Sequence, residues 1–169
     1  MKLPSGDVRQ RTNNGEIVGT HNQPGSGSVA FQLGGAYTGH FFNDILGISG
    51  DVIGRINTEG AGNFRSGNSL QVDVASSYRP HGWLVPVLEL NAIFQERDIE
   101  DNEAKRNSGV SSLFISPGLR ITLAGRHSLF AVASFPLWQD LPGIQNKEEY
   151  RLGAGYGISF DWDEFPSIL

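Results

Sequence analysis

The stretch NSLQVDVASSYRPHGWLVPVLELNAIFQER, residues 68–97, contains two runs in which apolar and polar side chains alternate at every second position. Because successive side chains of a β-strand point to opposite faces, this period of two indicates two strands. Arg79-Pro80-His81-Gly82 between the runs supplies the proline and glycine of a tight turn. Glu89 and Asn91 recur on the polar face, where they would need partners or water. The stretch therefore predicts a β-hairpin with one apolar face and one wet face.

The same alternation recurs along the chain, and it predicts seven strands, at residues 28–40, 45–57, 69–79, 83–97, 109–123, 128–138 and 148–162. The connections between them are alternately short and long, which is typical of a transmembrane β-barrel. We therefore predict an all-β fold, an antiparallel transmembrane β-barrel meander of about eight strands in a single domain, residues 1–169. Residues 1–27 would hold a strand stub and a long loop, residues 28–162 the seven strands, and residues 163–169 a tail. The stub at Met1–Pro4 either closes an eight-stranded barrel or belongs to a larger one, since bacterial barrels have even strand numbers.

The composition excludes several classes of protein. The chain has 169 residues, 22 glycines, no cysteine and a net charge of −5. Without cysteine there are no disulfides or thiolate metal sites. The negative charge and the lack of a basic cluster argue against nucleic acid as a partner. No apolar run approaches the roughly 18–20 residues of a membrane-spanning helix, which a barrel does not need. The segment Met1–Asp7 lacks the pattern of an export signal, so a barrel destined for export would need one upstream.

No motif predicts catalysis, a metal or a cofactor, and we expect the protein not to be an enzyme. Gly153-Ala154-Gly155-Tyr156-Gly157 lacks the lysine of a phosphate-binding loop and opens no helix, so we interpret it as small residues in a curved strand. The acidic run at residues 98–103 lacks the spacing of an EF-hand, which favours a solvated loop over a calcium site. No serine lies in a Gly-x-Ser-x-Gly motif, and the four histidines lack helical zinc spacing.

Aromatic side chains gather near the expected strand ends, where an interfacial girdle of a membrane barrel would lie. The alternative interpretation is an aromatic core in a soluble sandwich. These aromatics are Tyr37, Phe41, Phe42, Tyr78, Trp83, Trp138, Phe160 and Trp162.

Charged and amide side chains occupy the face opposite the apolar positions, and lipid would not tolerate them there. We predict that they line a lumen and select solutes by charge. A ladder of ion pairs that fills a narrow barrel is the alternative, and both stay open. The residues are Asp51, Arg55, Asp73, Glu89, Asn91, Arg120, Glu149 and Arg151.

Six short runs are similar to those of a bacterial family: Arg55-Ile56-Asn57-Thr58-Glu59-Gly60, Tyr78-Arg79-Pro80, Leu88-Glu89-Leu90-Asn91, Ile115-Ser116-Pro117-Gly118-Leu119-Arg120, Phe135-Pro136-Leu137-Trp138-Gln139-Asp140 and Tyr150-Arg151-Leu152. The chain resembles the outer-membrane transporters of the MetA-pathway of phenol degradation family over nearly its whole length. The resemblance implies the bacterial outer membrane as the location, and an N-terminal truncation of a longer barrel.

The function we expect is that of a transporter or channel for small molecules, with hydrophobic or aromatic solutes suggested by the family name alone. The expected partners are outer-membrane lipid, lipopolysaccharide, a small-molecule solute and the outer-membrane assembly machinery. Two other functions stay open, a soluble β-barrel that binds a ligand and a structural outer-membrane protein without a pore.

Overall fold

The computed structural model describes residues 1, 14–15, 27–123 and 126–159. Seven long strands form one sheet, namely β1 (Ala30–Phe41), β2 (Leu46–Asn57), β4 (Ser69–Tyr78), β5 (Leu84–Gln95), β8 (Val110–Leu123), β9 (His127–Asp140) and β10 (Arg151–Ile158). Each of them lies within a few residues of a strand that the alternation predicts. The predicted stub at residues 2–4, most of the loop at 5–27, the strand-end aromatics Phe160 and Trp162, and the tail at 163–169 lie outside the described residues.

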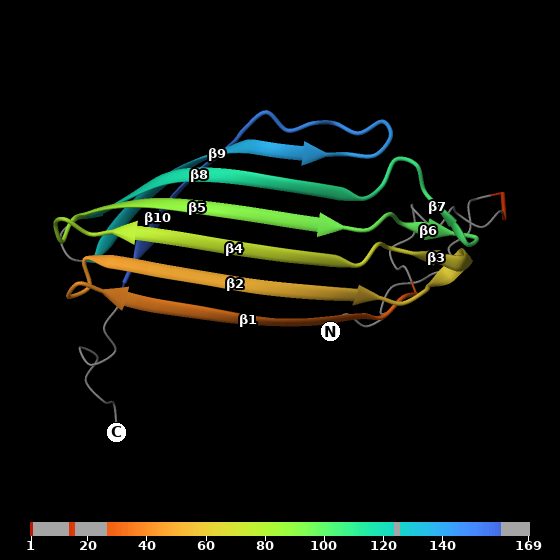
Figure 1. Cartoon of the computed structure of the whole chain (residues 1–169), viewed down its shortest axis with the longest axis horizontal. Coiled ribbons are helices and arrows are strands. Elements are labelled where there is room, and N and C mark those ends of the chain that lie inside the picture. Colours follow the sequence, from red (N-terminus) through yellow and green to blue (C-terminus); the bar gives the residue numbers. More distant parts are fainter. Residues whose placement is uncertain (2–13, 16–26, 124–125, 160–169) are drawn as a thin grey trace, which may run out of the picture.

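The seven strands form an antiparallel meander, in which every strand pairs with the next long strand along the chain. All the short turns lie at one end of the sheet and the long connections at the other (Figure 1). The antiparallel meander is thus confirmed. Among the described residues the pairing runs from β1 to β10, and no pair joins these two edge strands. What the structure contains is therefore a seven-stranded sheet with two edges.

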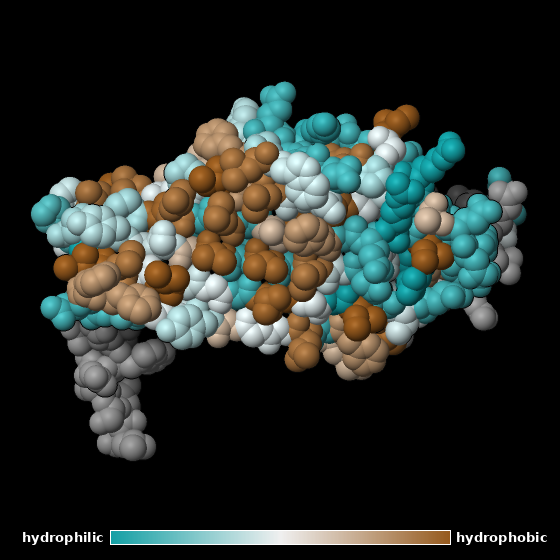
Figure 2. Space-filling model, viewed as in Figure 1, coloured by the Kyte–Doolittle hydropathy of each residue, from teal (hydrophilic) through white to brown (hydrophobic). Residues whose placement is uncertain are grey.

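The register places most of the apolar side chains of the seven strands on one side, here called the apolar face. Val52 pairs with Val72, and Val74 pairs with Leu90, so each pair shares a face. Much of this face is exposed, and Leu33 keeps 83% and Val74 47% of its accessible surface. Figure 2 shows apolar side chains gathered over the strands and hydrophilic ones over the end with the long connections. The exposed residues of the apolar face include Leu33, Tyr37, Val52, Val74, Leu88, Leu90, Leu119, Leu129, Leu152 and Tyr156.

A β-bulge shifts the register between β8 and β9. Phe114 pairs with Pro136, but its neighbour Leu113 pairs with Trp138, which leaves Leu137 as the extra residue. Simple alternation predicts Leu137 on the apolar face and Trp138 on the opposite face. That prediction is wrong beyond Pro136, because Trp138 pairs with Leu113 on the apolar face. Proline has no backbone N–H and cannot donate a hydrogen bond to the neighbouring strand. A bulge beside Pro136 therefore costs fewer inter-strand hydrogen bonds than a bulge elsewhere in the strand.

The long connections carry a second sheet that the alternation does not predict. It consists of β3 (Phe64–Arg65), β6 (Ile99–Glu100) and β7 (Glu103–Ala104), preceded by a short 3-10 helix, η2 (Ala61–Asn63). The prediction of polar loops at 58–68 and 98–108 is therefore incomplete, because each contains short paired strands.

The acidic run of the 98–108 connection is part of that structure. Asp101 and Asn102 both have positive φ, as a two-residue type I′ hairpin turn between β6 and β7 requires. The Asp98 carboxylate accepts a hydrogen bond of 2.8 Å from the Gly67 backbone N–H, and Glu100 pairs with Lys105. The Asp98 carboxylate therefore joins the two connections, whereas the pair of Glu100 and Lys105 lies within the second of them.

No helix among the described residues is both long enough and apolar enough to cross a membrane.

Candidate functional site: the polar face of the sheet

The side of the sheet opposite the apolar face, here called the polar face, carries seven of the eight predicted site residues. The register puts Asp51 of β2, Asp73 of β4 and Asn91 of β5 in one cross-strand row. Residues an even number of positions away from these share their face. The remaining members are Arg55 on β2, Glu89 on β5, Arg120 on β8 and Arg151 on β10.

Glu149 is the exception, and its prediction as a strand residue is wrong. Strand β10 begins at Arg151, whose partner on β9 is Ser134. Before that point the Gln139 side chain takes the place of a neighbouring strand, because its Nε2 donates to the Glu148 carbonyl at 2.7 Å and its Oε1 accepts from the Glu148 N–H at 3.3 Å. Glu149 is exposed in the connection between β9 and β10.

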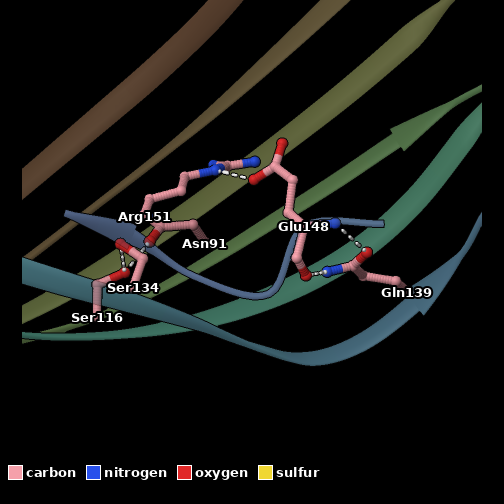
Figure 3. Close-up of polar contacts among 6 residues, drawn as sticks. All are labelled: Asn91, Ser116, Ser134, Gln139, Glu148 and Arg151. Atoms are coloured by element: carbon pink, nitrogen blue, oxygen red, sulfur yellow. Dashed lines mark hydrogen bonds and ion pairs between the residues drawn. The ribbon is translucent and has the colours of Figure 1, made fainter. Parts of the chain in front are cut away.

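A chain of side-chain hydrogen bonds crosses four strands of the polar face. Gln71 and Asn91 both donate to the Asp73 carboxylate, at 2.6 and 2.8 Å. The Ser116 hydroxyl then lies 3.0 Å from Asn91 Oδ1 and 2.7 Å from the Ser134 hydroxyl (Figure 3). Ser116 is only 1% exposed. Because each of these polar groups has a partner, this part of the face is fixed in one arrangement.

Arg151 spans a longer distance across the same face. It leaves β10 and places its guanidinium carbon 4.1 Å from the centre of the Phe114 ring on β8, two strands away. Its Nε also donates to the Glu148 carboxylate, and Figure 3 shows the two side chains pointing toward one another. This hydrogen bond lowers the pKa of Glu148 below that of an ordinary carboxyl, and the positive charge of Arg151 lowers it further. Phe114 is 3% exposed beneath the guanidinium.

The carboxylates of the polar face gather over β2, β4 and β5. A hollow of about 320 Å³ is lined by Asp51, Asp73, Glu89 and Asn91, together with Ser49, Gly50, Val74 and Ala75 of β2 and β4. No basic side chain lines it. Both interpretations of the charged set stay predictions, and one of its members, Arg151, forms an ion pair with Glu148. Within residues 27–123 and 126–159, no ion pair joins any two of Asp51, Arg55, Asp73, Glu89 and Arg120.

A second hollow on the same face lies nearer the short turns. It has a volume of about 380 Å³, and Glu89 of β5 and Arg120 of β8 both line it, with Phe130 of β9 and Gly157 of β10. Glu89 thus borders both hollows. The lining comes from four successive strands, so the polar face is concave in this region.

The glycine row of β10 makes room for side chains of β9. Gly155 pairs with Phe130, and a Cβ at Gly155 would lie 2.3 Å from the Phe130 ring. Gly153 and Gly157 face Val132 and Ser128 in the same way. The glycine run at residues 153–157 therefore makes room for side chains of β9. This agrees with the prediction from the sequence, which found neither the lysine nor the following helix of a phosphate-binding loop.

Four residues of this arrangement escape prediction from the sequence, namely Phe114, Ser116, Ser134 and Glu148. The alternation places Ser116 and Ser134 on the polar face. The sequence does not reveal that their hydroxyl groups hydrogen-bond to each other and to Asn91. Phe114 does leave a signal, because it is an aromatic residue at a polar position of its strand. Its partner Arg151 lies 37 positions later and cannot be inferred from spacing.

Several aromatic side chains of the apolar face lie toward the two ends of the strands. At the end with the short turns, Leu46 of β2 pairs with Phe41 of β1 and with Tyr78 of β4. Trp83 is exposed at the same end. Trp138 lies near the other end, beside Leu113. Tyr37, also predicted at a strand end, lies instead in the cross-strand row of Val74 and Leu90 near the middle of the sheet, so the predicted order holds only in part.

Comparison with known proteins gives one match. The model of the family described as "Putative MetA-pathway of phenol degradation" matches residues 12–163. No curated protein and no solved structure matches the chain. The family match covers all seven long strands and both faces of the sheet. The chain therefore belongs to the MetA-pathway of phenol degradation family.

Proposed function

We propose that the seven strands are part of a transmembrane β-barrel of a bacterial outer membrane, and that small molecules pass through its polar interior. The observation that carries this proposal is the inverted distribution of side chains. The apolar face is broad and exposed, whereas the concave polar face holds carboxylates and arginines. A water-soluble protein buries its apolar face, but a barrel in lipid turns it outward.

The strand lengths and the connections agree with this proposal. The long strands have 8 to 14 residues, and about 9–11 residues cross the hydrocarbon layer. In such a barrel the short turns at 41–44, 80–82 and 124–127 would face the periplasm, and the longer connections would face outward. Lipid and lipopolysaccharide would then contact the apolar face, and the assembly machinery would insert the strands. We propose no catalytic role for the protein.

Passage of solutes is favoured over a closed structural barrel by the open carboxylates. Asp51 and Glu89 line a hollow and form no ion pair within the described part of the chain. In a narrow, filled barrel such charges would be desolvated without partners, at a large cost in free energy. Water in a lumen removes that cost.

Single-channel recording of the full-length protein in a planar bilayer tests the proposal. We expect a conductance that prefers cations, because the larger group of unpaired charges is acidic. Glu89→Gln should lower the cation-to-anion permeability ratio by about twofold, as expected for one charge near the path of an ion. Glu59→Gln, which makes the same change in a connection outside the sheet, is the matched control.

The rival functions give different results in the same set of experiments. A soluble ligand-binding protein would not fractionate with outer membranes extracted by detergent, and its mobility in a gel would not change on heating. A structural barrel would fractionate there but would show neither conductance nor solute flux.

A further inference from the structure

The connection between β9 and β10, residues 141–150, is fastened to the connection that precedes β8. The Ile144 backbone N–H donates to Asn107 Oδ1 at 2.9 Å, and Gln145 Nε2 donates to the Gly109 carbonyl at 3.0 Å. The part of the connection far from the strands therefore has a defined place.

The same connection is also fastened to the polar face. Gln139 pairs with Ser112, which is 3% exposed on the polar face, so the Gln139 side chain lies on that face too. Its two hydrogen bonds to the Glu148 backbone draw the end of the connection over the sheet. The Glu148 carboxylate then reaches the Arg151 side chain.

Arg151 stands at mid-height of the sheet, on the same face as the acidic hollow. Phe114, which lies under its guanidinium, belongs to the cross-strand row that continues through Asn91 and Asp73 to Asp51. Neighbouring strands are about 4.8 Å apart, so the guanidinium lies about 10–15 Å along the sheet from the two carboxylates of that row. Opposite charges thus occupy one level of the polar face.

We propose that Arg151 sets the charge selectivity of the interior at this level, and that the connection at 141–150 controls it by presenting Glu148. The inference rests on the proposed function. While Glu148 is paired with Arg151, the guanidinium charge is neutralised and the carboxylates of Asp51 and Asp73 dominate. Cations and uncharged polar molecules then pass, and anions are held back. Without Glu148, the guanidinium over Phe114 becomes a site for the carboxylate of an anionic solute.

The test compares two variants that remove one carboxylate each. Glu148→Gln removes the partner of Arg151, whereas Glu149→Gln removes an exposed charge on the next residue, which lies outside β10. Both are measured by the reversal potential of the full-length protein in a bilayer with a potassium chloride gradient. We expect Glu148→Gln to lower the cation-to-anion permeability ratio at least about twofold, and Glu149→Gln to leave it near the wild-type value.

Arg151→Gln is the second variant, and it should change the ratio in the opposite direction, toward cations. Equal ratios for Glu148→Gln and Glu149→Gln, in a channel that conducts, would overturn this inference and leave the proposed function intact. The absence of conductance in the wild type would instead overturn the proposed function. Heat-modifiable gel mobility of every variant shows that the barrel has assembled.

Discussion

Val74→Arg is expected to lower the free energy of unfolding in a lipid bilayer by about 2–4 kcal/mol, the cost of an arginine facing lipid at the midplane. Val74 lies near the middle of β4, and its partners are Gly50 and Leu90 on the same apolar face. In the proposed barrel its side chain, which keeps 47% of its accessible surface, faces lipid beside these neighbours. The effect is measured by urea unfolding of the protein refolded into liposomes.

The matched control is Ala75→Arg, one position further along the same strand. Ala75 pairs with Ser49 and Glu89 on the polar face, and it lines the acidic hollow. An arginine there meets carboxylates and water, so its cost should be close to zero. Equal destabilisation by the two variants would contradict the assignment of the two faces.

Gly67→Ala is expected to lower the free energy of unfolding by about 1–3 kcal/mol, in the range of an overpacked buried site. A Cβ at Gly67 would lie 1.9 Å from the Glu96 backbone oxygen, so the backbone itself must move. That movement would also disturb two hydrogen bonds, from Asn57 Nδ2 to the Gly67 carbonyl at 2.8 Å and from the Gly67 N–H to Asp98 at 2.8 Å. Asn57 is 6% exposed, so its amide would be left without a partner.

Gly82→Ala serves as the control for this substitution. Gly82 lies in the turn at the other end of the sheet, and no atom lies within 4 Å of a Cβ built there. The two variants are compared by denaturant unfolding, and by proteolysis of the long connections. If both variants unfold at the same denaturant concentration as the wild type, the close contact between the backbones of Gly67 and Glu96 does not exist in solution.

The sequence predicts the seven long strands well, because a strand between an apolar and a wet environment must alternate at every second residue. The period is clear in residues 68–97 and locates β4 and β5 to within two residues. The same period is sufficient to place Asp51, Asp73 and Asn91 on one face. The period assigns the wrong face only where a bulge inserts an extra residue. This happens after Pro136, where Trp138 lies on the apolar face.

Other features depend on contacts that no local pattern records. Strands β3, β6 and β7 have two residues each, too few to show a period. Strand β10 begins later than the alternation predicts. At Glu148 the backbone N–H and carbonyl bond to the Gln139 side chain instead of to the backbone of a neighbouring strand. The contact between Arg151 and Phe114 crosses β9 and joins residues that are 37 positions apart in the sequence.

Spin labelling along β4 tests the central claim, that one face of the sheet meets lipid and the other meets water. Because the chain has no cysteine, a single cysteine at each of residues 71–76 carries the only label. In liposomes, labels at Val72 and Val74 should collide often with oxygen and seldom with a water-soluble nickel chelate. Labels at Asp73 and Ala75 should show the reverse. Low collision rates with both reagents at Val72 and Val74 would mean a dry protein core, and would contradict the proposed barrel.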